Sequence, residues 1–377
     1  MDHQANPLTV ILVLGALHGV ALGMFFFFHG RGDRGANIVL GILLVVFSIN
    51  FGLPKIVKDY HTQFPHLIAA AYPLPFLLGP LLYLYAKRLT SGREHNLKMR
   101  LHFIPFLTVT FYLMPFYLQS EAEKLDFIHK IRTTGLPVDW LALSGVKTLH
   151  LLGYLAATFW MLKQHGRQVR AVFSSIERIH LRWLRYLVFG TGCVWFVQFV
   201  FYLGFMFHKL VDPYIVADYA SGYATAIFVY SIGYMGLRQP EIFGMAIREL
   251  NIKKYHRSGL TPDKAERYLK KLLTYMEQNK PYRNSELTLP QLASEMDIPP
   301  NHLSQIINEK LQQNFFDFIN KYRVDEVKQR LANPGDNHFT ILAMAFDAGF
   351  NSKSAFYSAF QKHTGTSPSR YPRTVQK

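Results

Sequence analysis

The sequence contains one cysteine, Cys193, among 377 residues. A single thiol excludes an intramolecular disulfide and any zinc site built from several cysteines. The N-terminus has no basic stretch, Asp2 is acidic, and no small-residue cleavage site follows the first apolar run. We therefore expect no cleaved secretory signal peptide at residues 1–28.

The motifs of common enzyme classes are also missing. The sequence contains no H-E-x-x-H, no G-x-S-x-G, no P-loop and no paired acidic motif. Its scattered histidines His18, His102, His150 and His208 do not have the spacing of metal ligands. We therefore expect neither an enzyme activity nor a metal ion or cofactor.

Acidic residues are scarce: 25 Asp and Glu stand against 41 Lys and Arg, which gives a formal net charge of +16. The long apolar runs lie almost entirely before residue 237, whereas charge is spread throughout the remainder. This change in composition indicates a membrane-embedded part followed by a soluble part. A basic excess in each part suits membrane orientation and polyanion binding, respectively.

Seven segments have the length and composition of membrane-spanning helices, which need about 20 mostly apolar residues. They are approximately 8–28, 36–53, 66–86, 101–118, 140–162, 186–207 and 214–237. With the N-terminus outside, the inside loops 29–35, 87–100 and 163–185 carry 13 Lys and Arg, against 6 in the outside loops. The positive-inside rule therefore predicts a C-terminus in the cytoplasm. Prolines 73, 75 and 80 predict a kink in the third span.

Ionisable residues inside the predicted spans are candidates for an effector pocket. Lys147 and His150 lie one helical turn apart in the fifth span, and Asp218 lies near the outer end of the seventh. A charged side chain at mid-bilayer costs about 2.5–3.5 kcal/mol on insertion scales, so it usually faces a cavity or a partner. A structural Lys147–Asp218 ion pair is the alternative interpretation.

The soluble part begins with a connector and a helix. Residues 238–260 contain Gln239-Pro240, which should end the last span, and Thr261 and Pro262 then suit the start of a helix that extends to about Asn279. The spacing of Thr288 and Gln291 predicts a capping box at the start of a helix over 289–296. A turn at 297–299 and a helix over 300–311 complete a helix-turn-helix unit.

The unit then repeats after a long helix, predicted over 314–332. Thr340 caps a short helix, Gly349 supplies a turn that needs positive φ, and Ser352 caps a helix over 353–364. In a helix-turn-helix the second helix enters the major groove, so its outward polar side chains are the candidates for contacts with DNA. The candidates are Asn301, His302, Ser304, Gln305, Asn308 and Lys310 in the first unit, and Asn351, Ser352, Lys353, Ser354, Tyr357, Ser358, Gln361 and Lys362 in the second.

Residues 258–372 resemble the DNA-binding domain of AraC-type transcription regulators. The stretches that carry the resemblance are 287–293, 301–308, 315–323 and 349–356 with its continuation to Pro368. The N-terminal part is similar to the multi-pass sensor region of a membrane-embedded bacterial subgroup, in residues 79–83, 102–106 and 174–183.

The resemblance implies a bacterial inner-membrane regulator that binds double-stranded promoter DNA and acts on RNA polymerase. In the family the first recognition helix makes the stronger base contacts. Arg323 matches a common family arginine, and the resemblance makes it a further candidate for contact with DNA. This chain departs from the family pattern at Pro299, where an N-capping Ser is frequent, and at Ser358, where many members have Arg. Both departures put some contacts with DNA in doubt.

We therefore predict an all-α protein: a seven-helix transmembrane bundle (1–237), a connector (238–260) and an AraC-type double helix-turn-helix domain (261–377) joined by a long linker helix. It would regulate transcription in response to a small effector, extracytoplasmic or dissolved in the membrane, that the transmembrane domain senses, and it could act as a homodimer. Two alternatives stay open. One is a transporter or intramembrane enzyme with an appended regulatory domain, and the other is a helix-turn-helix that docks only to proteins.

Overall fold

The computed structural model describes residues 7–29, 33–91, 97–176, 181–207, 231, 260–336 and 338–371. Within these ranges the chain is helical and contains no named strand, which confirms the predicted all-α class. The chain divides into two compact units. The N-terminal unit comprises Met1–Lys163 with Leu181–Ile247, and the C-terminal unit comprises Gln164–His180 with Arg248–Lys377.

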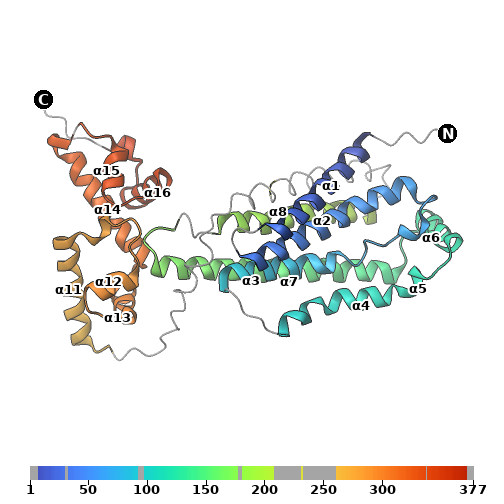
Figure 1. The fold of residues 1–377 in the computed structure, drawn as a ribbon, viewed down its shortest axis with the longest axis horizontal. Helices are drawn as coiled ribbons and strands as arrows, with labels where there is room; N and C mark the ends of the chain where they lie inside the picture. The colour runs from blue at the N-terminus through green and yellow to red at the C-terminus, as the bar shows by residue number, and fades with distance from the viewer. Residues whose placement is uncertain are drawn as a thin grey trace. The chain divides into compact units, whose positions relative to one another are not determined.

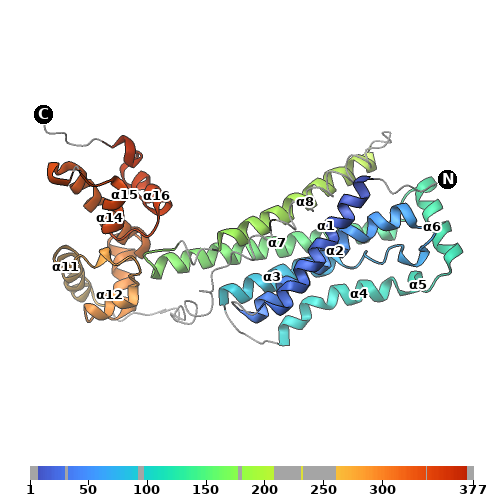
Figure 2. The same cartoon turned by 45° about the horizontal axis from the view of Figure 1, so that its top comes forward.

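The helices of the N-terminal unit lie largely side by side, as Figures 1 and 2 show for α1, α2 and α3. They are α1 (Pro7–Phe28), α2 (Arg34–Tyr60), α3 (Pro75–Ser91), α4 (Ile104–Tyr112), α5 (Met114–Tyr117), α6 (Glu121–Thr134), α7 (Val138–Val172) and α8 (Arg182–Phe207). The part of α7 that follows Lys163 belongs to the C-terminal unit. Gly23 and Gly41 allow α1 and α2 to approach closely, because a Cβ on Gly23 would lie 2.8 Å from the Gly41 carbonyl oxygen. Buried side chains of α1, α2, α3, α7 and α8 form one apolar cluster.

Among the described residues, one helix, α2, is long and apolar enough to cross a membrane. A second apolar stretch, Leu12–Phe28, is shorter. The prediction of seven spans is therefore not confirmed, and the predicted span 214–237 lies outside the described residues apart from Ser231.

Two of the predicted spans are interrupted. Where a kinked helix was expected over 66–86, a short 3₁₀ turn at Pro65–Leu67 is followed by further turns, and α3 begins only at Pro75. Proline fits the first turn of a helix, where its missing N–H removes no hydrogen bond, so Pro75 starts a helix and only Pro80 lies inside one. The expected span 101–118 is likewise divided into the end of a 3₁₀ segment, α4 and α5.

The C-terminal unit is built around the linker helix α14 (Phe315–Ala332). The other helices are α11 (Pro262–Asn279), α12 (Leu289–Glu295), α13 (Pro300–Gln305), α15 (Ile341–Asp347) and α16 (Lys353–Thr364). Figure 1 shows α11, α12 and α13 around one part of α14, and α15 and α16 around the other. Two apolar clusters form accordingly: one includes Leu292 and Phe318, and the other includes Val327 and Phe356.

Side-chain caps start three of these helices as the sequence predicts. Thr288 and Gln291 form a reciprocal capping box at α12, and Thr340 and Ser352 accept backbone hydrogen bonds at α15 and α16. Thr261 precedes α11 but makes no capping hydrogen bond, so Pro262 is the local signal that starts this helix. The two helix-turn-helix units thus have the predicted helix order.

Candidate nucleic-acid interface

The recognition segment of the first unit is α13 followed by a π-helical turn, Ile306–Lys310, rather than one α-helix over 300–311. The wider turn is closed by the bond from Leu311 N to Ile306 O, 3.3 Å. Pro299 provides no side-chain cap for α13. Leu303, Ile306 and Ile307 face the core.

The polar side chains of this segment are held by local hydrogen bonds. Asn308, Glu309 and Lys310 are exposed, whereas Asn301, Ser304 and Gln305 are half-buried. The Asn308 amide nitrogen donates to the Ser304 carbonyl, 2.8 Å away. The Gln305 amide nitrogen donates to a Glu309 carboxylate oxygen, 3.0 Å away.

Glu309 was not among the predicted site residues, although its position four residues after Gln305 places it on the same helical face. Its carboxylate orients the Gln305 amide and repels phosphate. Because the nearby carboxylate repels phosphate, Gln305 is a better candidate for contact with a base edge than for contact with the DNA backbone.

His302 is half-buried rather than fully exposed. Its Nδ1 is buried without a hydrogen-bond partner among the described atoms, and its ring centroid lies 6.1 Å from that of Tyr268 on α11. The structure therefore places His302 between helices, where packing is its evident contribution.

The second unit presents its predicted residues along α16. Asn351, Lys353, Ser354, Ser358, Gln361 and Lys362 are exposed, and Ser352 and Tyr357 are half-buried. Ser352 accepts from Ala355 N at 3.1 Å, so its hydroxyl is engaged in capping the helix.

Three cationic or aromatic side chains of α16 already have neighbours that they contact. The Lys362 ammonium lies 2.6 Å from the Asp317 carboxylate of α14. The Tyr357 hydroxyl lies 3.4 Å from the Ser369 hydroxyl, and the Lys353 ammonium lies over the Tyr357 ring at 5.5 Å. Because Asp317 neutralises Lys362, Lys353 is the stronger candidate for a phosphate contact in this unit.

Arg323 does not reach the surface in this structure: its side chain is 1% exposed. Its guanidinium donates to the carbonyls of Tyr282 (2.7 Å) and Asn284 (2.8 Å) and to the Asn320 side chain (3.2 Å). The resemblance implied contact with DNA, but the structure gives Arg323 a place in the interior. Its fork of N–H donors satisfies carbonyls that would otherwise be buried without partners.

Arg323 lies at the interface between the two helix-turn-helix units. This interface, here called the seam, also contains Arg283, Glu326 and Gly349. The Arg283 guanidinium pairs with the Glu326 carboxylate at 2.6 Å. Gly349, with φ of +98°, packs so closely on the loop after α11 that a Cβ there would collide with the carbonyl oxygens of Tyr282 and Arg283. Burial, reinforced by the Glu326 carboxylate, raises the pKa of Tyr282 well above its ordinary value. The sequence predicted positive φ at Gly349, and the structure confirms it.

Two residues that sequence reasoning missed come from the C-terminal unit's other segment, 164–180. Ser174 accepts hydrogen bonds from Arg323, and Ser175 accepts one from Asn351. Their partners lie 149 and 176 residues away along the chain, so no local pattern could indicate these contacts.

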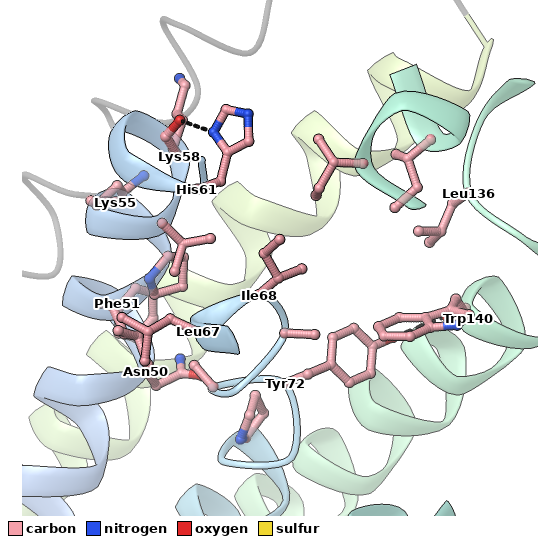
Figure 3. A pocket seen from close by; sticks show the side chains of 18 of the residues that line it. Asn50, Phe51, Lys55, Lys58, His61, Leu67, Ile68, Tyr72, Leu136 and Trp140 are labelled. Carbon is pink, nitrogen blue, oxygen red and sulfur yellow. Dashed lines mark hydrogen bonds between the residues drawn. The ribbon is translucent and has the colours of Figure 1, made fainter. Parts of the chain in front are cut away.

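A separate cavity in the N-terminal unit bears on the predicted effector residues (Figure 3). Lys147 lines this cavity. His150 is not among its lining residues and instead packs against Phe76 and Tyr154, with ring centroids 5.2 and 4.9 Å away. Asp218 lies outside the described residues. The structure therefore brings Lys147, but not His150, to this cavity.

Comparisons with known proteins agree with the architecture of the C-terminal unit. Residues 292–374 match a family model described as a helix-turn-helix domain. The Melibiose operon regulatory proteins of Escherichia coli strain K12 and of E. coli O6:H1 strain CFT073 are each 29% identical to this chain over 113 residues. These alignments cover 30% of this chain and 35% of each relative, about a third of the relatives' own length.

A solved structure of a protein of unknown function from Listeria innocua is 25% identical and covers 27% of this chain and 91% of its own, with a TM-score of 0.24. That score is too low to carry an argument. The family match supports a helix-turn-helix domain in the C-terminal part of this chain.

Proposed function

We propose that the chain is a membrane-bound, sequence-specific transcription regulator of the AraC type. Its C-terminal unit binds promoter DNA, and its N-terminal helices sense a small effector. The observation that carries the proposal is the pair of helix-turn-helix units assembled on α14, within a region that matches a helix-turn-helix family model.

The length of α14 suits two contacts on one face of a duplex. Its 18 residues span about 27 Å at 1.5 Å per residue. Successive major-groove faces on one side of B-DNA lie about 34–36 Å apart. A rigid helix of this length with a unit packed on each part could hold α13 and α16 near that spacing.

A lipid environment for the N-terminal helices is supported by their outward side chains. Large apolar residues stand exposed on α4, α7 and α8, among them Phe111 (69%), Leu149 (71%), Trp160 (66%), Phe189 (72%) and Phe196 (67%). Soluble monomers rarely expose so many large apolar groups, which a bilayer would cover. With the charge bias of the loops, this favours a multi-pass protein of the bacterial inner membrane, N-terminus outside and C-terminus in the cytoplasm.

The proposed partners follow from this arrangement. Double-stranded promoter DNA contacts α13 and α16, RNA polymerase responds to the bound protein, and a second copy of the chain could occupy an adjacent site. An effector can shift this equilibrium only if it binds two states of the protein with different affinity.

Binding of DNA by a fragment of residues 258–377 tests the central claim. We expect affinity that falls steeply as salt rises, because phosphate contacts release counterions. A fragment that is folded by circular dichroism but does not bind any duplex at low salt would refute the DNA-binding function. A reporter fused after Lys377 that is active only outside the cytoplasm would refute the proposed orientation.

A further inference from the structure

The cavity in the N-terminal unit has a volume of about 570 Å³. It is lined by α2, the start of α3, α6, α7 and α8, together with the turns around residues 67–72. Most of its lining is aliphatic or aromatic, as at Phe51, Ile68, Phe127 and Trp140. This size and lining are typical of sites for small apolar ligands.

Among the described residues, the charged side chains that line this cavity have one sign. They are Lys55, Lys58 and Lys147, and none of the described lining residues is acidic. Figure 3 shows Lys55, Lys58 and His61 along the end of α2, across the cavity from Tyr72 and Trp140. Positive charge in an apolar cavity attracts anions and raises their local concentration.

The neighbours of Lys147 indicate where an anionic group would be bound. The Lys147 ammonium lies 4.8 Å from the ring centroid of Tyr72 and 5.9 Å from that of Trp195. Trp195 is 9% exposed, and its indole N–H is buried without a hydrogen-bond partner among the described atoms. Buried N–H donors are rarely left unpaired, so an ammonium and an unpaired N–H side by side suit a ligand that supplies an acceptor oxygen.

We propose that this cavity binds an amphiphilic anion, with its carboxylate or phosphate on Lys147 and the Trp195 N–H and its apolar body against Phe51, Ile68 and Trp140. The proposal rests on the proposed function, in which the N-terminal unit senses an effector. The anion could come from a free monocarboxylic acid or from the headgroup of an anionic lipid, which share this chemistry.

Quenching of tryptophan fluorescence by 2-bromooctanoate tests this site in the full chain, held in phosphatidylcholine nanodiscs. The bromine next to the carboxylate lies beside Trp195 if the site is occupied as proposed. We expect saturable quenching that is lost in Trp195→Phe and weakened at least tenfold in Lys147→Met. Lys147→Arg, which keeps the charge, and Lys163→Met, outside the cavity, should bind as the wild type does.

The neutral methyl ester of 2-bromooctanoate is the matched ligand control. Quenching by the ester at the same concentrations as the acid, or unchanged binding in Lys147→Met, would overturn the proposal. Nanodiscs that contain phosphatidylglycerol distinguish the two sources, because an anionic lipid in the site would compete with the bromo acid. No DNA is present, so the outcome is independent of the DNA-binding test.

A second set of contacts surrounds residues 173–175, here called the strap, which follow α7 and belong to the C-terminal unit. Ser174 is 1% exposed. Its backbone N–H and its hydroxyl both donate to the Leu287 carbonyl, at 3.2 and 2.7 Å, and Phe173 forms an isolated antiparallel bridge with Thr288. The strap is thereby fixed to the loop that starts α12 in the first helix-turn-helix unit.

Two of these residues, Ser174 and Ser175, also contact the linker helix and the second helix-turn-helix unit. Arg323 donates to the Ser174 carbonyl and hydroxyl oxygens, each at 3.1 Å, and the Asn351 side chain donates to the Ser175 hydroxyl. Arg170, near the end of α7, stacks on Phe316 of α14 at 6.0 Å. The strap therefore contacts both helix-turn-helix units. One of its partners is Asn351, which lies just before α16 and which the sequence predicts to face DNA.

We infer that the strap is a restraint on DNA binding. While the strap is bound to the two helix-turn-helix units, it holds the Asn351 side chain and fixes the angle between α13 and α16. When the strap is released, Asn351 can contact DNA and the angle can change. The helix α7 extends from residue 138 to residue 172, so the strap follows directly on its last residue. This inference rests on the proposed binding of promoter DNA.

A disulfide between the strap and the second unit tests the restraint in the full chain. Ser175→Cys and Asn351→Cys are combined with Cys193→Ala, which removes the native thiol. We expect the two cysteines to form a disulfide under mild oxidation. The oxidised protein should bind a duplex, selected from a random pool for binding to the wild type, at least tenfold more weakly than the same protein does after reduction. Each single cysteine variant should be unaffected by oxidant.

Failure to form the disulfide, or equal DNA affinity before and after reduction, would overturn the inference. Disulfide formation reports the docked strap without DNA. A chain that forms the disulfide but in neither state binds any duplex would refute the proposed function together with the restraint, whereas efficient binding in both states would refute the restraint alone.

Discussion

Arg283 and Glu326 form a bidentate ion pair that ties the loop after α11 to the linker helix α14. The Arg283 Nη2 lies 2.6 Å from Glu326 Oε1, and its Nε lies 2.9 Å from the same oxygen and 3.1 Å from Oε2. The two side chains differ in burial: Glu326 is 6% exposed and Arg283 is 52% exposed. Removing Arg283 and removing Glu326 should therefore lower the free energy of unfolding by different amounts.

We expect Arg283→Ala to destabilise the C-terminal unit by about 2 kcal/mol, because it leaves a buried carboxylate without its charged partner. Glu326→Gln should cost less, since the exposed guanidinium can be hydrated and the amide keeps one acceptor. Urea unfolding of the 258–377 fragment measures both values. Equal costs, or a larger cost for Glu326→Gln, would contradict the assigned asymmetry.

Gly349 provides a second test of the seam. Gly349→Ala should destabilise the same fragment by more than 2 kcal/mol, because the new methyl group collides with backbone carbonyls and the residue must keep positive φ. Gly365→Ala is the matched control, since Gly365 also has positive φ (+75°), but no atom of the described residues lies within 4 Å of a Cβ built there. It should cost about 1 kcal/mol, the strain of the backbone alone. Similar costs at both positions would show that the contact at Gly349 is unimportant.

The features that the sequence predicted correctly depend on single residues or on pairs a few residues apart. Examples are the capping pair Thr288 and Gln291, the cap Ser352 and the positive φ of Gly349. These signals locate both helix-turn-helix units. The start of α3 at Pro75 escaped prediction because hydropathy alone does not distinguish a helix from a run of apolar turns.

The features that escaped prediction in the site depend on contacts far apart in the sequence. Arg323 is a charged residue on a helix that also bears exposed charges, and nothing near it in the chain shows that the strap covers it. The packing of His302 against Tyr268 of α11 also escaped prediction, because its polarity alone predicted a position on the outer face. Side-chain burial follows from tertiary packing, which periodicity describes only coarsely.

The buried position of Arg323 leads to a prediction that separates structure from DNA contact. Arg323→Met should lower the stability of the C-terminal unit and weaken binding to all duplexes, because it leaves the carbonyls of Tyr282 and Asn284 without a donor. The dependence of the binding constant on salt should stay unchanged, since no phosphate contact is lost. Titrations at several salt concentrations check this. A slope reduced by about 1 would show instead that Arg323 contacts a phosphate in the complex.

The first recognition segment allows base contacts to be distinguished from phosphate contacts. Gln305→Ala and Asn308→Ala should each reduce discrimination between the selected site and a mutated site by about 1–3 kcal/mol, with little change in non-specific affinity. Lys310→Ala should weaken both sites alike and reduce the salt slope by about 1. Glu309→Gln should raise non-specific affinity, because it removes a carboxylate that repels phosphate and frees Gln305 from a charged acceptor. Competition titrations with the two duplexes measure all four variants. Wild-type discrimination in both amide variants would mean that α13 and its π-helical turn do not read the base sequence.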